Sequence, residues 1–331
     1  MNIGRDYVSR EQSNTIKDIY GYEITKDEIQ WVCKQHDLGD IKKIYGVLGG
    51  KNNVPILVET YKGKYVLRYV TYATSKERIN DIEDIILCLN KASLPAVNAI
   101  KDRLGDNYTF TNNRMVQVYP FIKGVKFNFR PEQIKANAKV LKKFHNALKL
   151  YKADPLPDHP ISLTEEYLQK RLDRLYKNKE SVSESSLSRI KSLYSTIIKH
   201  WREADKNNLK ETIIHCDWHP WNLLYHEDGS VACILDMDHV QPGNRIYDVA
   251  YFIYWIFKFN SNEQNRKIYL EIFLDGYGGL TPEEERILPL EVSKIAFNFI
   301  IKKVSQAEKE LKENEPLIQY FLSNEGKGFL H

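Results

Sequence analysis

Four polar residues in one stretch of the chain have the types and the spacing that phosphoryl transfer requires. His215 and Asp217 precede Asn222 in the pattern H-x-D-x4-N, and Asp236 follows an apolar Ile-Leu pair. Transfer of the γ-phosphoryl group of ATP to a hydroxyl needs a carboxylate that accepts or orients the hydroxyl proton. It also needs hard oxygen ligands for Mg²⁺, such as an amide oxygen and a second carboxylate. The stretch therefore predicts Asp217 as the proton acceptor and Asn222 with Asp236 as metal ligands, with ATP and Mg²⁺ as cofactors.

Short apolar runs beside these residues predict strands that deliver them to one edge. We expect buried strands at 213–215 and 233–235, and Glu227-Asp228-Gly229 between them has the composition of a hairpin turn. His215 belongs to the catalytic loop, where we expect it to fix the shape of the loop by hydrogen bonding rather than to transfer a proton. Asp238 is a further carboxylate near the metal site, and its role stays open.

The pattern resembles the aminoglycoside phosphotransferase/choline kinase-like superfamily, which shares the protein-kinase fold. That family has H-G-D-x-x-x-x-N followed by I-D, and here Cys216 replaces the glycine, at a backbone position rather than a ligand position. Asp248, followed by Val-Ala, matches the D-L-A sequence that braces the loop. The resemblance covers about residues 40 to 300. It implies an α+β protein with a two-lobed protein-kinase-like fold, an N-terminal antiparallel sheet lobe and a mostly helical C-terminal lobe.

The glycine-containing segment 46–53 lies between expected strands at 41–47 and 54–60. Glycines let backbone amides approach phosphates closely, and such amides attract anions. The segment lacks the G-K-[ST] of a Walker A loop, and a Gly-Gly turn between strands is usually only a turn. In this context it resembles the nucleotide-positioning loop of the family. The residues that this implies for the phosphates are Gly49, Gly50 and Asn53.

Arg68, in the expected strand 65–70, stands where protein kinases carry a lysine that pairs with the nucleotide phosphates. The planar guanidinium suits phosphate oxygens, although an arginine on an edge strand can also be merely solvated. Residues 75–91 predict a helix that should carry the acid that pairs with Arg68. Glu83 is the first choice and Glu77 the second, because the register is uncertain by about one turn.

The run 114–124 resembles the strand that enters the interlobe hinge of the family. Adenine is expected to bond to the backbone of this run, at Val118, Tyr119 and Phe121. We place the boundary near Pro120, so that residues 1–120 form the nucleotide-binding lobe and residues 121–331 the catalytic and substrate lobe.

Apolar periodicity predicts helices in the second lobe. His145, on the first of them, is expected to be a hydrogen-bonded core histidine rather than a catalyst. Thr281, followed by Pro and by Glu284, has the pattern of a helix start. We expect helices at 131–150 and at 165–201, the second in one or two pieces with the serine-rich segment 181–188 as the break. The apolar run 249–257 predicts the start of a further helix. Another helix is expected to begin at Thr281, and the last long helix is expected at 292–311.

Composition bounds the class of protein and its partners. The net charge of +4 is too small to indicate a nucleic-acid binder. No apolar run reaches the roughly 18 residues of a membrane span, and the first residues lack the apolar region of a signal peptide. Four isolated cysteines are typical of reduced thiols. We therefore expect a cytoplasmic protein whose partners are a nucleotide and a small-molecule substrate, with no nucleic acid and no membrane; no motif indicates an oligomeric state.

Two other classes of protein remain as alternatives. One is a catalytically idle kinase-fold structural protein, such as the related spore-coat proteins, and the intact Asp217, Asn222 and Asp236 argue against it. The other is a protein kinase. Its A-P-E and activation-loop segments are missing after Asp236, where the chain continues directly to Asp248 and an apolar helix.

The acceptor of the phosphoryl group is expected to be an aminoglycoside, a sugar or an amino alcohol. Trp218, His219 and Trp221 lie inside the catalytic loop, where they either pack the loop or form a wall for such a substrate. The segment 236–243 resembles the N-acetylhexosamine 1-kinase branch, whereas the Gly-Tyr and Leu-Thr-Pro-Glu sequences near 276–283 are closer to homoserine kinase-like members. The sequence does not choose among them.

Overall fold

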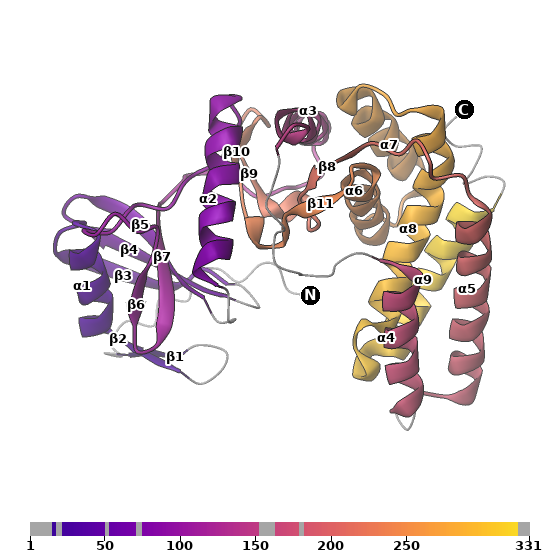
Figure 1. Cartoon of the computed structure of the whole chain (residues 1–331), viewed down its shortest axis with the longest axis horizontal. Coiled ribbons are helices and arrows are strands. Elements are labelled where there is room, and N and C mark those ends of the chain that lie inside the picture. Colours follow the sequence, from indigo (N-terminus) through magenta and orange to yellow (C-terminus); the bar gives the residue numbers. More distant parts are fainter. Residues whose placement is uncertain are drawn as a thin grey trace. The chain divides into compact units, whose positions relative to one another are not determined.

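The protein is described here from a computed structural model, which describes residues 15–17, 22–49, 53–70, 75–151, 163–178 and 182–323. Gly50, one of the expected phosphate-positioning residues, lies outside these ranges. The chain divides into two compact units, Met1–Lys123 and Gly124–His331, which we call the first and the second unit (Figure 1).

The first unit is built on a five-stranded antiparallel sheet in the order β3-β4-β5-β7-β6. Val58, Leu67 and Val118 from its three central strands are fully buried and pack in one core cluster. The elements of this unit are β1 Thr15–Lys17, β2 Glu23–Thr25, α1 Lys26–Gln35, β3 Ile41–Val47, β4 Asn53–Thr60, β5 Gly63–Val70, α2 Lys76–Lys91, β6 Thr109–Thr111 and β7 Arg114–Pro120.

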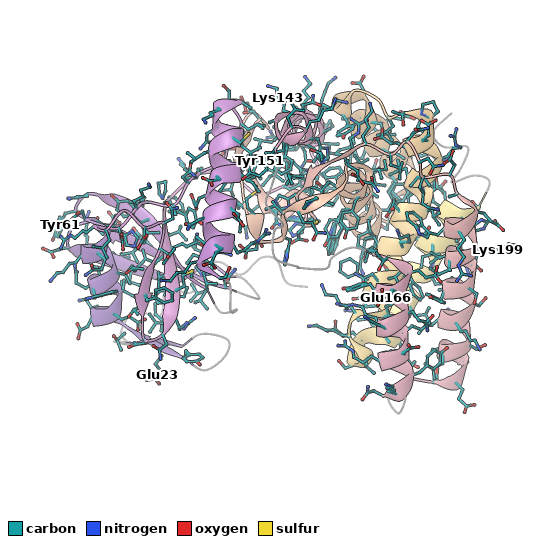
Figure 2. The ribbon with its side chains drawn as sticks, viewed as in Figure 1. Glu23, Tyr61, Lys143, Tyr151, Glu166 and Lys199 are labelled. Carbon is teal, nitrogen blue, oxygen red and sulfur yellow. The ribbon has the colours of Figure 1, made fainter. Side chains whose placement is uncertain are left out.

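Capping side chains fix where the two helices of this unit begin. The Thr25 hydroxyl accepts a hydrogen bond from the Glu28 N–H at the start of α1, and Ser75 does the same for Arg78 at the start of α2. Tyr61, in the tight turn between β4 and β5, is 79% exposed and points away from the sheet (Figure 2). The expected strands and helix of this lobe are confirmed within a few residues.

The second unit is mostly helical, with two short strand pairs beside α3 and α6. Its helices are α3 Pro131–Leu148, α4 Glu165–Lys177, α5 Glu184–Glu203, α6 Ile246–Phe259, α7 Glu263–Tyr277, α8 Pro282–Lys302 and α9 Ala307–Leu322. Its strands are β8 Glu211–Ile214, β9 Leu223–Tyr225, β10 Val231–Ile234 and β11 Gln241–Asn244. No helix in the described ranges combines the length and the apolar character needed to cross a membrane.

The strand pairing around the catalytic loop differs from the expected one. The hairpin joins β10 to β9, not to the strand at 213–215, and β8 pairs instead with β11, with Ile214 opposite Gln241. Gly229 lies in the hairpin turn at φ +88°, and a Cβ there would come within 2.8 Å of Glu132. The β8–β11 pair was not predicted, because Gln-Pro-Gly-Asn has none of the residues that favour strands.

Two helix boundaries also differ from expectation. The last helix was expected at 292–311, and this is wrong: α8 ends at Lys302, Lys303 is extended, and α9 begins at Ala307 after one 3₁₀ turn. No glycine or proline marks this break, so no local signal predicted it. The break between α4 and α5 ends earlier than the serine-rich segment suggested, since the Ser183 hydroxyl accepts from the Ser186 N–H and starts α5.

Candidate active site

The catalytic loop begins at the end of β8 and is anchored there by one carboxylate. The N–H groups of His215 and Cys216 donate to Oδ2 and Oδ1 of Asp248 at 2.8 and 2.9 Å. Asp248 is fully buried in the first turn of α6. Cys216 lies in the left-handed region at φ +65°, which explains why the family pattern favours glycine at this position. Asp248 therefore braces the loop, as its match to D-L-A implied.

His145 supports that brace from α3. Its Nε2 lies 3.0 Å from Asp248 Oδ2 and its Nδ1 lies 2.8 Å from the hydroxyl of Tyr277. Burial is the largest influence on this imidazole and lowers its pKa, against the opposing effect of Asp248. His145 is a hydrogen-bonded core histidine, as expected.

His215 ties the loop to the segment that carries Asp236. Its Nε2 donates to the Leu235 carbonyl at 3.0 Å, and its Nδ1 accepts the N–H of Asp217 at 3.3 Å. The ring is completely buried. Because both ring nitrogens are used on backbone groups, one on Asp217 and one on Leu235, the geometry supports a positioning role and not proton transfer.

Asp217 presents an oriented carboxylate. Its Oδ1 accepts a 2.7 Å hydrogen bond from the Tyr251 hydroxyl, and its Oδ2 accepts a 3.0 Å bond from Nδ2 of Asn222. His219 Nε2 lies 3.7 Å from Oδ2, and the side chain of Asp217 stays 24% exposed. Such a carboxylate is fixed in direction and still accessible, which suits a group that accepts a hydroxyl proton. Tyr251 was not predicted as a site residue, because its sequence context is that of a core aromatic helix.

Asn222 and Asp236 have a geometry that fits a magnesium ion. Nδ2 of Asn222 donates to the backbone carbonyl of Asp217 at 2.9 Å and also to Oδ2 of Asp217. The amide oxygen of Asn222 is therefore the atom left for a metal. The Asn222 carbonyl accepts the Leu235 N–H at 2.8 Å, which holds the turn with Asp236 next to Asn222. Asp236 is exposed, and its backbone lies in the left-handed region at φ +58°.

This pair alone is a sparse metal site. Among the described residues there is no group of three or more His, Cys, Asp or Glu side chains that could hold a metal ion. Mg²⁺ normally keeps waters and shares phosphate oxygens, so two protein oxygens suffice when a nucleotide is bound. The donor set therefore fits a Mg²⁺–nucleotide complex better than a resident ion.

The three aromatic residues of the loop have different surroundings. Trp218 is completely buried and its Nε1 donates to Oδ1 of Asn137 at 2.7 Å, so it packs the core and is not a substrate wall. Trp221 is partly exposed, and its ring lies 6.1 Å from that of Trp255. The His219 ring lies 5.6 Å from Trp255. An aromatic wall near Asp217 is therefore formed by Trp221 and Trp255.

The phosphate-positioning candidates belong to the first unit. Gly49 has φ +107°, a conformation that glycine adopts without strain, and no described atom lies within 4 Å of the position of its absent Cβ. Asn53 begins β4 opposite Val70. Arg68 donates from Nη1 to Oε1 of the buried Gln117 at 2.7 Å. Their roles toward a nucleotide remain predictions.

Glu83 is held by its own unit rather than by a direct bond to Arg68. Its carboxylate accepts from Asn98 Nδ2 at 2.8 Å and from the Ala99 N–H at 3.0 Å. Burial raises the pKa of Glu83, and the charge of Arg68 opposes this as one of the smaller influences. Glu77, the second choice, is exposed at the start of α2. Of the two acids, the structure brings Glu83 within electrostatic reach of Arg68.

Part of the expected adenine-binding backbone is already used. The Val118 carbonyl accepts the Ile100 N–H at 2.7 Å, and the Phe121 N–H donates to the Lys64 carbonyl at 2.9 Å. Tyr119 is paired with Val66 in the sheet. The Val118 carbonyl and the Phe121 N–H are thus already satisfied by other backbone groups of the first unit, and the adenine-binding role of this run stays a prediction.

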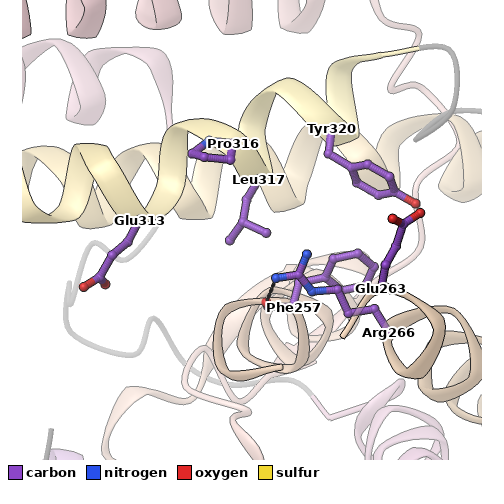
Figure 3. Close-up of a pocket in the computed structure, with 7 residues that line it drawn as sticks. All are labelled: Phe257, Glu263, Arg266, Glu313, Pro316, Leu317 and Tyr320. Carbon is purple, nitrogen blue, oxygen red and sulfur yellow. Dashed lines mark hydrogen bonds between the residues drawn. The ribbon is translucent and has the colours of Figure 1, made fainter. Parts of the chain in front are cut away.

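A cavity lies away from these residues, between α6, α7 and α9 (Figure 3). It measures about 420 Å³ and is lined by Phe257, Glu263, Arg266, Glu313, Pro316, Leu317 and Tyr320. Arg266 donates from Nη2 to the Phe257 carbonyl and from Nε to that of Asn260, so it satisfies the C-terminal end of α6. The cavity contains none of the predicted site residues.

Comparison with known proteins agrees with this geometry. A model described as "Phosphotransferase enzyme family" matches residues 44–289. A homoserine kinase of Caulobacter sp. (strain K31) is 22% identical over 289 residues, which cover 86% of this chain and 87% of that protein.

Solved structures share the fold at low identity. A microcompartment-associated aminopropanol kinase superposes with a TM-score of 0.69 at 14% identity, over 92% of this chain and 99% of that one. Spectinomycin phosphotransferase APH(9)-Ia, in complex with ADP and spectinomycin, superposes with a TM-score of 0.65 at 17% identity. The match covers 93% of this chain and 98% of that one. The expected α+β, protein-kinase-like fold class is confirmed by such neighbours together with the antiparallel sheet and the helical second unit.

Proposed function

Because the chain belongs to the phosphotransferase enzyme family, we propose that it transfers the γ-phosphoryl group of ATP to a hydroxyl of a small molecule. The observation that carries this proposal is the carboxylate of Asp217. Its two oxygens are held by Tyr251 and Asn222, and the side chain stays partly open. A kinase-fold protein that serves only as a structural component has no need of such an arrangement.

The reaction follows from these groups. The acceptor hydroxyl donates its proton toward Asp217 as its oxygen forms a bond to the γ-phosphorus, and the bond from that phosphorus to the bridging oxygen of ADP breaks. Asp217 orients the hydroxyl and receives the proton, while Asn222 and Tyr251 keep the carboxylate in place. His215 and Asp248 act through the backbone of the loop and do not touch the reacting atoms.

The amide oxygen of Asn222 and the carboxylate of Asp236 would hold Mg²⁺ with the nucleotide. The bound ion would neutralise charge on the phosphate oxygens. On the first unit, Gly49, Gly50, Asn53 and Arg68 are the groups we assign to the phosphates. Glu83 would orient Arg68 through the electrostatic influence noted above.

The acceptor is an aminoglycoside, a sugar or an amino alcohol. The partly exposed rings of Trp221 and Trp255 beside His219 and Asp217 support a small polar acceptor with some apolar surface. The similar proteins named above include kinases of homoserine and of aminopropanol and a spectinomycin phosphotransferase.

An ATP-consumption screen over sugars, aminoglycosides and amino alcohols tests the proposal. At least one compound should raise ATP turnover above the background with water, and the increase should vanish in Asp217→Asn. A protein that labels peptide hydroxyls and none of these compounds would contradict the proposal and favour a protein kinase.

A further inference from the structure

The cavity between α6, α7 and α9 has the size of a small-molecule site. Its volume of about 420 Å³ falls within the roughly 300–1,000 Å³ of pockets that hold ligands. All of its lining residues belong to the second unit, and none of them is assigned to phosphoryl transfer. Phe257 and Leu317 are buried, and the Tyr320 ring lies 5.8 Å from that of Phe257. Figure 3 shows Leu317 pointing from α9 toward α6 and α7. Part of the cavity wall is therefore apolar.

Arg266 brings a cation with unused hydrogen-bond donors to this cavity. Its Nη2 and Nε satisfy the carbonyls of Phe257 and Asn260, whereas Nη1 makes no hydrogen bond within the described part of the chain. The guanidinium carbon lies 5.5 Å from the centre of the Phe257 ring. Because an arginine side chain stays protonated in proteins, the cavity carries a permanent positive charge, and Nη1 offers its N–H groups to an anion.

Glu263 places a negative charge close to this cation. It precedes Arg266 by three residues on α7, and side chains with this spacing are neighbours on a helix. The two charged ends form no ion pair with each other, since Oε1 of Glu263 lies 3.4 Å from Nζ of Lys267 instead. Burial lowers the pKa of Arg266, and the charge of Glu263 opposes this effect. The two charges are thus near each other, with room between them for a group that bridges them.

The other carboxylate of the lining, Glu313 of α9, has cations of its own. Its Oε2 lies 3.2 Å from Nζ of Lys258, and its Oε1 lies 3.8 Å from Nζ of Lys309. The charges that a ligand meets are therefore chiefly those of Arg266 and Glu263. A purely cationic ligand would be repelled by the first, and a purely anionic ligand by the second. A ligand that carries both charges satisfies both residues.

We propose that this cavity binds an α-amino acid with an apolar side chain, in its zwitterionic form. The carboxylate of the ligand accepts from Nη1 of Arg266, and its ammonium group donates to Glu263. Charged hydrogen bonds of this kind are stronger than neutral ones. An α-amino acid carries its two charges on neighbouring groups, which suits partners one helical turn apart. Its side chain lies against the apolar wall formed by Phe257, Leu317 and Tyr320. The cavity is then a ligand site separate from the site of phosphoryl transfer.

The test compares amino acids with analogues that lack one of the two charges. L-Leucine is matched with isoamylamine, which lacks the carboxylate, and with 4-methylpentanoate, which lacks the amine. L-Phenylalanine is matched in the same way with phenethylamine and 3-phenylpropanoate. In titration calorimetry of the full chain, at least one of the two amino acids should bind at least about tenfold more tightly than both of its analogues, the size of one charged hydrogen bond.

Arg266→Gln removes the cation from the cavity. The affinity for the amino acid should fall by at least about tenfold, whereas the affinity for the matched amine should not weaken. Arg286→Gln makes the same change on the exposed surface of α8, outside the cavity, and should keep the amino-acid affinity within about twofold of wild type.

Glu263→Gln is the second variant, because it leaves the bonds from Arg266 to the end of α6 in place and tests the site if Arg266→Gln fails to fold. It should weaken binding of the amino acid by at least about tenfold and should not weaken binding of the matched carboxylate. Glu271→Gln, exposed on the same helix and outside the cavity, is its control and should bind the amino acid as the wild type does.

Asp217→Asn shows whether the amino acid binds in the cavity or at the site of phosphoryl transfer. It should bind the amino acid as tightly as the wild type, because Asp217 does not line the cavity. The proposal is overturned if neither amino acid binds, if the analogues bind equally well, or if Glu263→Gln leaves the affinity unchanged. Loss of binding in Asp217→Asn would also overturn it. The measurement uses no nucleotide and no turnover, so its result leaves the proposed phosphotransferase function untouched.

Discussion

The hydroxyl of Tyr251 donates a 2.7 Å hydrogen bond to Oδ1 of Asp217 across 34 residues of sequence. Tyr251 is buried, and burial first, then the charge of Asp217, raises the pKa of its phenol. The phenol therefore stays protonated and remains a donor to the carboxylate over the whole neutral range. This contact makes the orientation of the Asp217 carboxylate depend on α6 as well as on the catalytic loop.

Tyr251→Phe removes only the hydroxyl. Without this donor Asp217 Oδ1 loses one of the bonds that orient it, and kcat should fall by about tenfold, or about 1.4 kcal/mol. Steady-state kinetics with the acceptor found in the screen measures this. Tyr254→Phe, on the same helix but bonded to Asn314, serves as the control and should keep kcat within about twofold of wild type. Equal kcat in wild type and Tyr251→Phe would contradict the positioning role.

Asp217→Asn keeps the size of the side chain and removes its basicity. Turnover should fall by about 10² to 10⁴, the usual contribution of general base catalysis. Nucleotide binding, followed by calorimetry, and the unfolding temperature should stay close to wild type, because Asp217 is partly exposed and does not bind the nucleotide. A variant that retains wild-type turnover would remove Asp217 from its assigned role.

Asp236→Ala tests the metal site. Because the metal would bridge this carboxylate and the phosphates, wild-type protein should bind ATP more tightly with Mg²⁺ than with a chelator, and Asp236→Ala should lose that difference. Titration calorimetry under the two conditions is the measurement. The same experiment with Asp228→Ala, in the exposed hairpin turn, provides a variant with the same charge change at another place. Equal affinities with and without Mg²⁺ in the wild type would count against a metal role.

His145 should make stability depend on pH. Its pKa is lowered from 6.5 by burial, so the folded protein favours the neutral ring. A group with a depressed pKa contributes stability above its unfolded pKa, and that contribution is lost as pH falls through 6.5 toward the folded value. Thermal unfolding at a series of pH values between about 7.5 and 5 should show a steeper loss in wild type than in His145→Gln. Exposed His226→Gln should follow the wild type, and a His145→Gln profile parallel to the wild type would contradict the assignment.

Much of the catalytic loop could be read from the sequence because its geometry is local. Asp217 and Asn222 are five residues apart, and their side chains bond directly within one turn of chain. The cap at Thr281 acts over three residues and was equally visible. Strands β3 to β5 follow each other through short turns, so apolar runs and turn residues were enough to place them.

Long-range partner choice was decided only by the tertiary structure. Nothing in the sequence near Trp218 says that its indole would be buried on Asn137, whereas Trp221 stays partly exposed, three residues away. Local pattern gives each segment its secondary structure and its apolar face, but the neighbour that covers that face depends on the packing of the whole unit.

The surroundings of Asp217 are also decided by long-range contacts. Asp217 could be singled out by its motif, whereas Tyr251 comes from α6, where it has the sequence context of a helix interior. Only the packing of α6 against the catalytic loop brings the Tyr251 hydroxyl onto Asp217. The sequence by itself determined the phosphoryl-transfer chemistry, because that chemistry needs a few residues at short fixed spacing. The tertiary structure decided what faces it, because that depends on contacts between helices far apart in the chain.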